Sequence, residues 1–124
     1  MTRSAHREAV GYFEQALSAL RHLPEQRHTR EQAIDLRLAL RSALRPLGDS
    51  GRILAYLCEA EVVAEALDDP RRLAQVSSFL SVHFYHRAVY DQAIAAAQRA
   101  LALATAGGEV VLHALANFFL GQAY

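Results

Sequence analysis

The sequence contains no lysine and no tryptophan, and its 124 residues include only one cysteine, three prolines and six glycines. A single thiol cannot form a disulfide within the chain. The absence of lysine excludes Schiff-base catalysis by a lysine amine and a phosphate loop of the Walker type. Because breakers are few and 52% of the residues are hydrophobic, we expect a folded chain with a packed core.

An excess of charge of one sign is also absent, since 13 arginines balance 13 acidic residues. Nucleic acid is therefore a disfavoured partner, because a phosphate-tracking surface needs a broad positive field. No apolar run approaches the ~20 residues that a membrane span requires. Charges at Arg3, Arg7, Glu8 and Glu14 interrupt any signal-like stretch. We expect no membrane partner and a cytoplasmic location.

The main pattern in the sequence is an internal repeat with an offset of forty residues. Two apolar columns follow this offset, Leu40, Leu80 and Leu120 in one and Leu44, Phe84 and Tyr124 in the other. Ala60 and Ala64 likewise match Ala100 and Ala104. A further copy is partly visible near the N-terminus, where Ala9-Val10, Phe13 and Ala16-Leu17 resemble Ala93-Ile94, Ala97 and Ala100-Leu101.

Between breakers the apolar residues recur every three or four positions, which is the period of a helix. This predicts six helices, at 4–22, 29–47, 51–67, 70–87, 90–106 and 109–124. Thr29 is the expected cap of the second helix, Gly48-Asp49-Ser50-Gly51 the expected turn after it, and Pro70 suits a first helical turn. The short connections place consecutive helices antiparallel. We therefore expect an all-α fold of stacked helical hairpins, an α-solenoid, forming one domain over residues 1–124.

Two motifs carry a family resemblance. Leu120-Gly121-Gln122-Ala123-Tyr124 resembles the Leu-Gly-x-x-Tyr signature of the first helix in a tetratricopeptide hairpin, and residues 80–84 are a looser copy. The segment 88–94 resembles the Gly-x-Tyr-x-x-Ala-Ile turn of the same family, with Ala88 in place of the glycine. The spacing of forty residues departs from the family's usual 34. The chain also resembles the tetratricopeptide-rich arms of bacterial signalling ATPases related to adenylate cyclases, and it looks like a fragment of a longer protein.

The resemblance implies a groove lined by the first helix of each hairpin. The implied partner-binding residues are Asp35, Leu38, Ser42 and Arg45 in one hairpin, Gln75, Ser78, Val82, Tyr85 and His86 in the next, and Leu115, Phe118 and Gln122 in the last. Such a surface suits an amphipathic helix or an extended peptide, with Tyr85 and Phe118 as aromatic anchors.

The residues that could support catalysis or metal binding do not form a recognisable site in the sequence. His83 and His86 are too few for a zinc site, so we expect His83 to pack half-buried and His86 to face a groove or water. Cys58 has no partner motif, and a buried, hydrophobe-like role is expected for it. We expect no catalytic residue, metal ion or cofactor.

A basic stripe of Arg37, Arg41 and Arg45 is the sharpest polar feature of the sequence. It could bind an acidic peptide or a phosphate, or it could be a solvated face paired with Glu59, Glu61 or Asp49. Both interpretations stay open at this point.

Three classes of function remain. The leading one is a non-catalytic scaffold that binds a peptide or a neighbouring domain. A second is homo-oligomerisation, for example as a homodimer, through apolar terminal helices around Phe118 and Phe119. A third is a catalytic or small-molecule sensor domain, which would need a defined cavity with converging polar groups.

Overall fold

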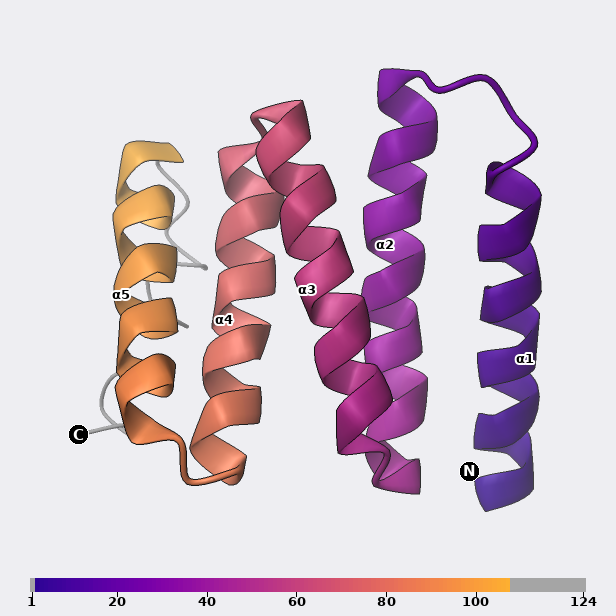
Figure 1. Ribbon diagram of the computed structural model, residues 1–124, viewed down its shortest axis with the longest axis horizontal. Coiled ribbons are helices and arrows are strands. Elements are labelled where there is room, and N and C mark those ends of the chain that lie inside the picture. Colours follow the sequence, from indigo (N-terminus) through magenta and orange to yellow (C-terminus); the bar gives the residue numbers. More distant parts are fainter. Residues whose placement is uncertain (1, 108–124) are drawn as a thin grey trace. The chain divides into compact units, whose positions relative to one another are not determined.

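A computed structural model describes residues 2–107 of the chain, and these form an all-helical structure (Figure 1). Its elements are α1 (Arg3–Leu20), α2 (Arg27–Leu44), the short 3-10 helix η1 (Arg45–Leu47), α3 (Ser50–Leu67), α4 (Pro70–His86) and α5 (Tyr90–Gly107). No strand occurs between residues 2 and 107. The predicted all-α class is confirmed. Five predicted helices correspond to α1–α5, and the sixth, at 109–124, lies outside the described residues.

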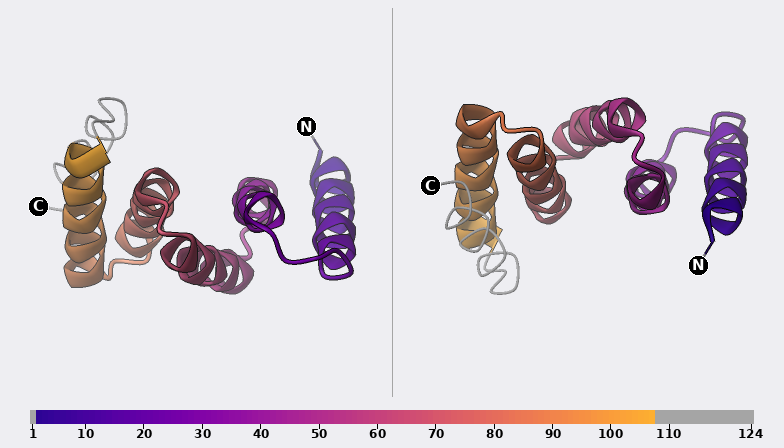
Figure 2. Two further views of the ribbon diagram at one scale, coloured as in Figure 1. Left: turned by 90° about the horizontal axis from the view of Figure 1, so that it is seen from above. Right: turned by 90° about the horizontal axis from the view of Figure 1, so that it is seen from below.

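The chain divides into two compact units, Met1–Val63 and Ala64–Tyr124, with the boundary inside α3. In the first unit α1 and α2 lie side by side and antiparallel, joined by residues 21–26 (Figures 1 and 2). Only Val10 and Leu17 of α1 are buried, whereas α2 buries Ile34, Leu38, Leu40, Ala43 and Leu44. The single domain expected from the sequence stays a prediction.

The second unit is built on the antiparallel pair α4 and α5 (Figure 1). Small side chains allow the two helices to approach closely. The buried alanines are Ala74 on α4 and Ala93, Ala97, Ala100 and Ala104 on α5. The Ser81 hydroxyl of α4 also donates a hydrogen bond of 2.8 Å to the carbonyl of Ala93 on α5, so the pair is joined by a polar contact as well as by packing.

Two helices end with a left-handed residue that is not glycine. Asp68 follows α3 with φ 52°, and Ala88 follows α4 with φ 61°. After α4, the amide of Ala88 bonds to the carbonyl of Tyr85 and the amide of Val89 to that of Phe84. This pair of bonds defines a Schellman motif, whose left-handed position usually holds glycine. Ala88 thus occupies the left-handed position that glycine usually holds. In the tetratricopeptide turn that this segment resembles, the same position is glycine.

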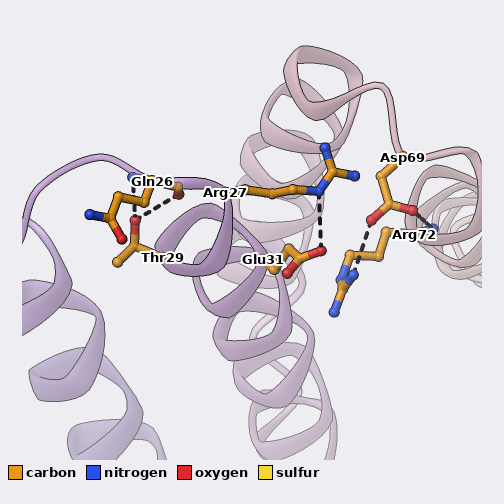
Figure 3. Close-up of polar contacts among 6 residues, drawn as sticks. All are labelled: Gln26, Arg27, Thr29, Glu31, Asp69 and Arg72. Atoms are coloured by element: carbon orange, nitrogen blue, oxygen red, sulfur yellow. Dashed lines mark hydrogen bonds and ion pairs between the residues drawn. The ribbon is translucent and has the colours of Figure 1, made fainter.

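The start of α2 differs from the prediction, because Thr29 is not its cap. The helix begins at Arg27 with Gln26 as the cap, and Thr29 lies in the first turn. Its Oγ1 accepts a hydrogen bond of 2.9 Å from the backbone amide of Gln26 (Figure 3). Thr29 thus bonds to the cap residue from inside the first turn and is not the cap itself. The predicted role of Pro70 is confirmed: it opens α4, and Asp69 Oδ1 accepts the amide of Arg72 at 3.1 Å.

Helix α2 also ends earlier than the predicted residue 47. The α-helix stops at Leu44 and continues as the 3-10 helix η1, which contains Pro46. Proline has no amide hydrogen to donate to the preceding turn, so a regular α-helix cannot continue through it. Gly48 then adopts φ 72° and reverses the chain, and Asp49 Oδ1 accepts the amide of Arg52 at 3.2 Å. The predicted turn at 48–51 is confirmed only for Gly48 and Asp49, because Ser50 and Gly51 already belong to α3.

Burial follows the repeat of forty residues. Every position from 53 to 65 has the same class of exposure as the position forty residues later, from 93 to 105. The N-terminal copy follows a different register from the predicted one. Buried Val10 and Leu17 of α1 correspond to buried Leu57 and Ala64 of α3, an offset of 47, whereas the predicted match pairs them with half-buried Ile94 and Leu101.

Candidate partner-binding surfaces

The predicted groove residues of α2 do not share one environment. Asp35, Ser42 and Arg45 are exposed, whereas Leu38 is buried with 9% of its surface accessible. Ser42 donates to the carbonyl of Leu38 at 3.3 Å, a contact within the helix. Three of the four predicted side chains are therefore accessible on this helix.

On α4 the predicted groove residues divide in the same way. Gln75, Val82 and Tyr85 are half-buried and His86 is exposed. Ser78 is fully buried, and its hydroxyl donates to the carbonyl of Ala74 at 3.0 Å. The remaining predicted residues, Leu115, Phe118 and Gln122, lie outside the described residues.

Four accessible side chains of α4 form a narrow stripe at helical spacing. We call Gln75, Phe79, Val82 and His86 the α4 stripe. Its first three positions match Asp35, Ala39 and Ser42 of α2 at the offset of forty, and all of these are half-buried or exposed. Phe79 was missed in the sequence analysis, although a helical spacing of four from Gln75 could have indicated it. Leu38 and Ser78 are a matched pair too, and both are buried.

Aromatic rings gather where the α4 stripe meets the turn into α5. The ring of Tyr85 packs edge-on against His86 at a centroid distance of 5.5 Å and against Tyr90 at 5.9 Å. Tyr90 is 51% exposed and the neighbouring Val89 is 39% exposed. The left-handed turn at Ala88 brings the first residues of α5 back beside the last turn of α4. Exposed rings held in this way are typical anchors for a protein partner.

The predicted arginine stripe is not one continuous exposed surface. Arg37 and Arg41 are half-buried, and Arg45 is exposed. Arg37 forms an ion pair of 3.0 Å with Glu59, which confirms the predicted pairing for this residue. Burial, together with the neighbouring charge of Arg45, lowers the pKa of Arg41. Binding of an acidic ligand by these three residues stays a prediction.

A polar network in the first unit was not found in the sequence analysis. Glu14 of α1 accepts hydrogen bonds from Arg52 and Tyr56 of α3, both at 2.5 Å. The hydrogen bonds from Tyr56 and then from Arg52 lower the pKa of the Glu14 carboxyl. Burial and the bond to Glu14 raise the pKa of Tyr56. These partners are 38 and 42 residues from Glu14, so no local pattern marks them.

The environment of Cys58 contradicts the sequence-based expectation, because its side chain is exposed and not buried. It lies on the outer side of α3, away from the buried positions Leu57 and Ala60. Partial desolvation and the charges of Glu61 and Glu59 raise the pKa of its thiol. A thiol with a raised pKa is a poor nucleophile near neutral pH.

The histidines of α4 have the predicted environments. His83 is half-buried and His86 is exposed. Over the part of the chain that the structure describes, no group of three or more His, Cys, Asp or Glu side chains is placed to hold a metal ion. Glu65 of α3, an acidic residue outside this pair of histidines, forms an ion pair of 2.5 Å with Arg99 of α5.

A mainly apolar hollow of about 370 Å³ lies between α1 and α2 in the first unit. Ala16 and Leu20 of α1 and Leu36 of α2 supply apolar lining, and Gln32 and Asp35 line it as well. Asp35 is therefore the one predicted groove residue that borders this hollow. The other lining residues were not among the predicted site residues.

The chain matches no family model and no curated protein. Among residues 2–107, no helix combines the length and the apolar character needed to cross a membrane. The tetratricopeptide resemblance and the cytoplasmic location stay predictions.

Proposed function

We propose that this chain is a non-catalytic scaffold: a tetratricopeptide-like stack of helical hairpins that binds a peptide or a neighbouring domain. The observation that carries the proposal is the matching burial of positions 53–65 and 93–105, because equal exposure at a fixed offset is expected when copies of one hairpin have equivalent surroundings. The matched accessible positions of α2 and α4 supply the binding face in each copy.

The composition of the α4 stripe indicates the partner. Phe79 and Val82 give it an apolar centre. His86 at its end packs on the ring of Tyr85, which packs in turn on Tyr90. Gln75 is the uncharged polar residue at the other end. An amphipathic helix or an extended peptide with spaced apolar anchors fits this arrangement, because its apolar side chains gain by burial and need no charged partner.

The proposal is tested by selecting peptides from a random display library against the full chain and measuring their affinity by calorimetry. The double variant His86→Ala, Tyr90→Ala removes two exposed rings, so the fold should persist, and binding should weaken by about tenfold or more. The matched control is Ala95→Ser, at an exposed position of α5 outside the stripe. Peptides whose affinity is equal for all three chains would contradict the proposed binding face.

A further inference from the structure

Three rings form a corner where α4 turns into α5. We call Tyr85, His86 and Tyr90 the aromatic corner. The ring of Tyr85 meets that of His86 at 70° and that of Tyr90 at 60°, so the rings do not lie in parallel planes. Tyr85 is half-buried, whereas His86 is exposed and Tyr90 is 51% exposed. The corner therefore has a buried base and two accessible sides.

The backbone of the turn holds the aromatic corner in place before any ligand binds. The amide of Ala88 bonds to the carbonyl of Tyr85 at 3.0 Å, and the amide of Val89 to that of Phe84 at 2.9 Å. These bonds fix the start of α5, and with it Tyr90, beside the last turn of α4. A partner does not have to order the rings, and this lowers the entropic cost of binding.

The charges at the aromatic corner favour a cationic ligand. The face of an aromatic ring is electrically negative and attracts a guanidinium or ammonium group. Asp91, which directly follows Tyr90 in the first turn of α5, is exposed and forms no ion pair within residues 2–107. Arg87 is exposed too, and its charge is offset by that of Asp91. No arginine of the described segment lies against the three rings, so the chain's own cations leave them accessible.

We propose that the aromatic corner binds the guanidinium group of an arginine in the partner peptide, and that Asp91 accepts hydrogen bonds from it. A guanidinium is planar and stacks on ring faces, and its N–H groups pair with a carboxylate in a bidentate manner. A quaternary ammonium group has no N–H to donate to Asp91, so arginine uses both parts of the site. The inference rests on the proposed function, because the corner lies at the His86 end of the α4 stripe and adds an arginine to the peptide expected there.

Titration of the full chain with N-acetylarginine amide, followed by NMR of the tyrosine rings, tests the corner by itself. N-acetylcitrulline amide is the control ligand, because citrulline has nearly the same shape without the charge. The arginine compound should shift the ring signals of Tyr85 and Tyr90 and bind at least about fivefold more tightly than the citrulline compound.

Three variants assign this preference to the corner. Tyr90→Leu keeps an apolar side chain but removes a ring, and Asp91→Asn removes the carboxylate charge, so each should reduce the preference for arginine. Tyr12→Leu is the matched control. Tyr12 is 69% exposed and packs edge-on against Phe13 at 5.8 Å in the first unit, so its replacement should leave the preference unchanged. Circular dichroism checks that each variant is folded.

Equal affinity for the two compounds, or a preference that Tyr90→Leu does not reduce, would overturn the inference. The peptides selected against the full chain give a second test, in which citrulline in place of their arginine should weaken binding at least about fivefold. Peptides that bind the α4 stripe without this loss would overturn the inference and leave the proposed function standing. Binding of the arginine compound at the corner, with no peptide selected, would contradict the proposed function instead. Self-association of the chain that Tyr90→Leu abolishes would make a second copy the occupant and overturn the peptide partner.

Discussion

Ala88 holds a left-handed backbone, φ 61°, in the turn between α4 and α5. A side chain with a Cβ is disfavoured there by about 1–2 kcal/mol, whereas glycine is not. Glycine also has more conformational freedom in the unfolded chain, which offsets part of the stability gained by relieving the strain. We expect Ala88→Gly to raise the free energy of unfolding by about 0.5–1 kcal/mol in urea denaturation. Ala95→Gly, in the middle of α5, should lower it by a similar amount. A destabilising Ala88→Gly would contradict the strain assigned to this turn.

The helices α4 and α5 are joined through Ser81, one of three buried serines of α4. Ser81 donates to the Ala93 carbonyl at 2.8 Å, while the buried Ser77 hydroxyl has no hydrogen-bond partner. We expect Ser81→Ala to cost about 1 kcal/mol of stability, because it removes a satisfied buried hydrogen bond. Ser77→Ala should be neutral or slightly stabilising, since the methyl group removes a buried polar atom that gains nothing. Urea denaturation of both variants compares them directly, and equal losses would contradict the assignment.

The first compact unit is held together differently from the second. Its helix α1 has only two buried residues, and Glu14 supplies its hydrogen bonds to α3, whereas α4 has seven buried residues. We expect Glu14→Gln to increase hydrogen exchange in α1 and to leave exchange in α4 and α5 unchanged. Because Glu14 is 39% exposed, the loss should be modest, about 1 kcal/mol. Hydrogen exchange followed by mass spectrometry measures the change in α1 and compares it with α4 and α5.

The same contact makes the stability of the first unit depend on pH. The fold lowers the pKa of Glu14 below its usual value of 4.5, so the carboxylate stabilises the folded state. This stabilisation is fully present above about pH 4.5 and is lost as the pH falls through the lowered pKa. The protection of α1 against exchange, corrected for the intrinsic rate, should therefore fall below pH 4.5 in wild type and change less in Glu14→Gln. Equal pH dependence in the two chains would show that Glu14 does not hold α1.

Much of the secondary structure followed from local patterns in the sequence. The period of the apolar residues located α1–α5 to within a few residues, with help from Pro70 and from the turn that begins at Gly48. This worked because helix initiation and termination depend on neighbouring residues. The errors at Thr29 and at the end of α2 arose at helix ends. The Thr29 hydroxyl bonds to a backbone amide from inside the first turn, where the prediction had it at the cap position. At the other end of α2, Pro46 makes the last turn a 3-10 helix.

The residues of the candidate site were predicted less well than the helices. Asp35, Gln75 and His86 were placed on accessible sides of their helices, but Leu38 and Ser78 are buried, and Phe79 and Tyr90 were missed. A shift of one position along a helix turns a side chain by about a quarter of a turn, so a family position carried over between sequences can miss the exposed side. Tyr90 contacts Tyr85 only because Ala88 reverses the chain between them.

The sequence by itself determined the helical class, the breaks between helices and the repeat of forty residues, because each depends on the order and period of neighbouring side chains. Only the tertiary structure decided which side of each helix is accessible, which carboxylate holds α1 to α3, and that Leu20 and Leu36 border an open hollow. These features depend on contacts between residues far apart in the chain, and neither composition nor spacing specifies such contacts.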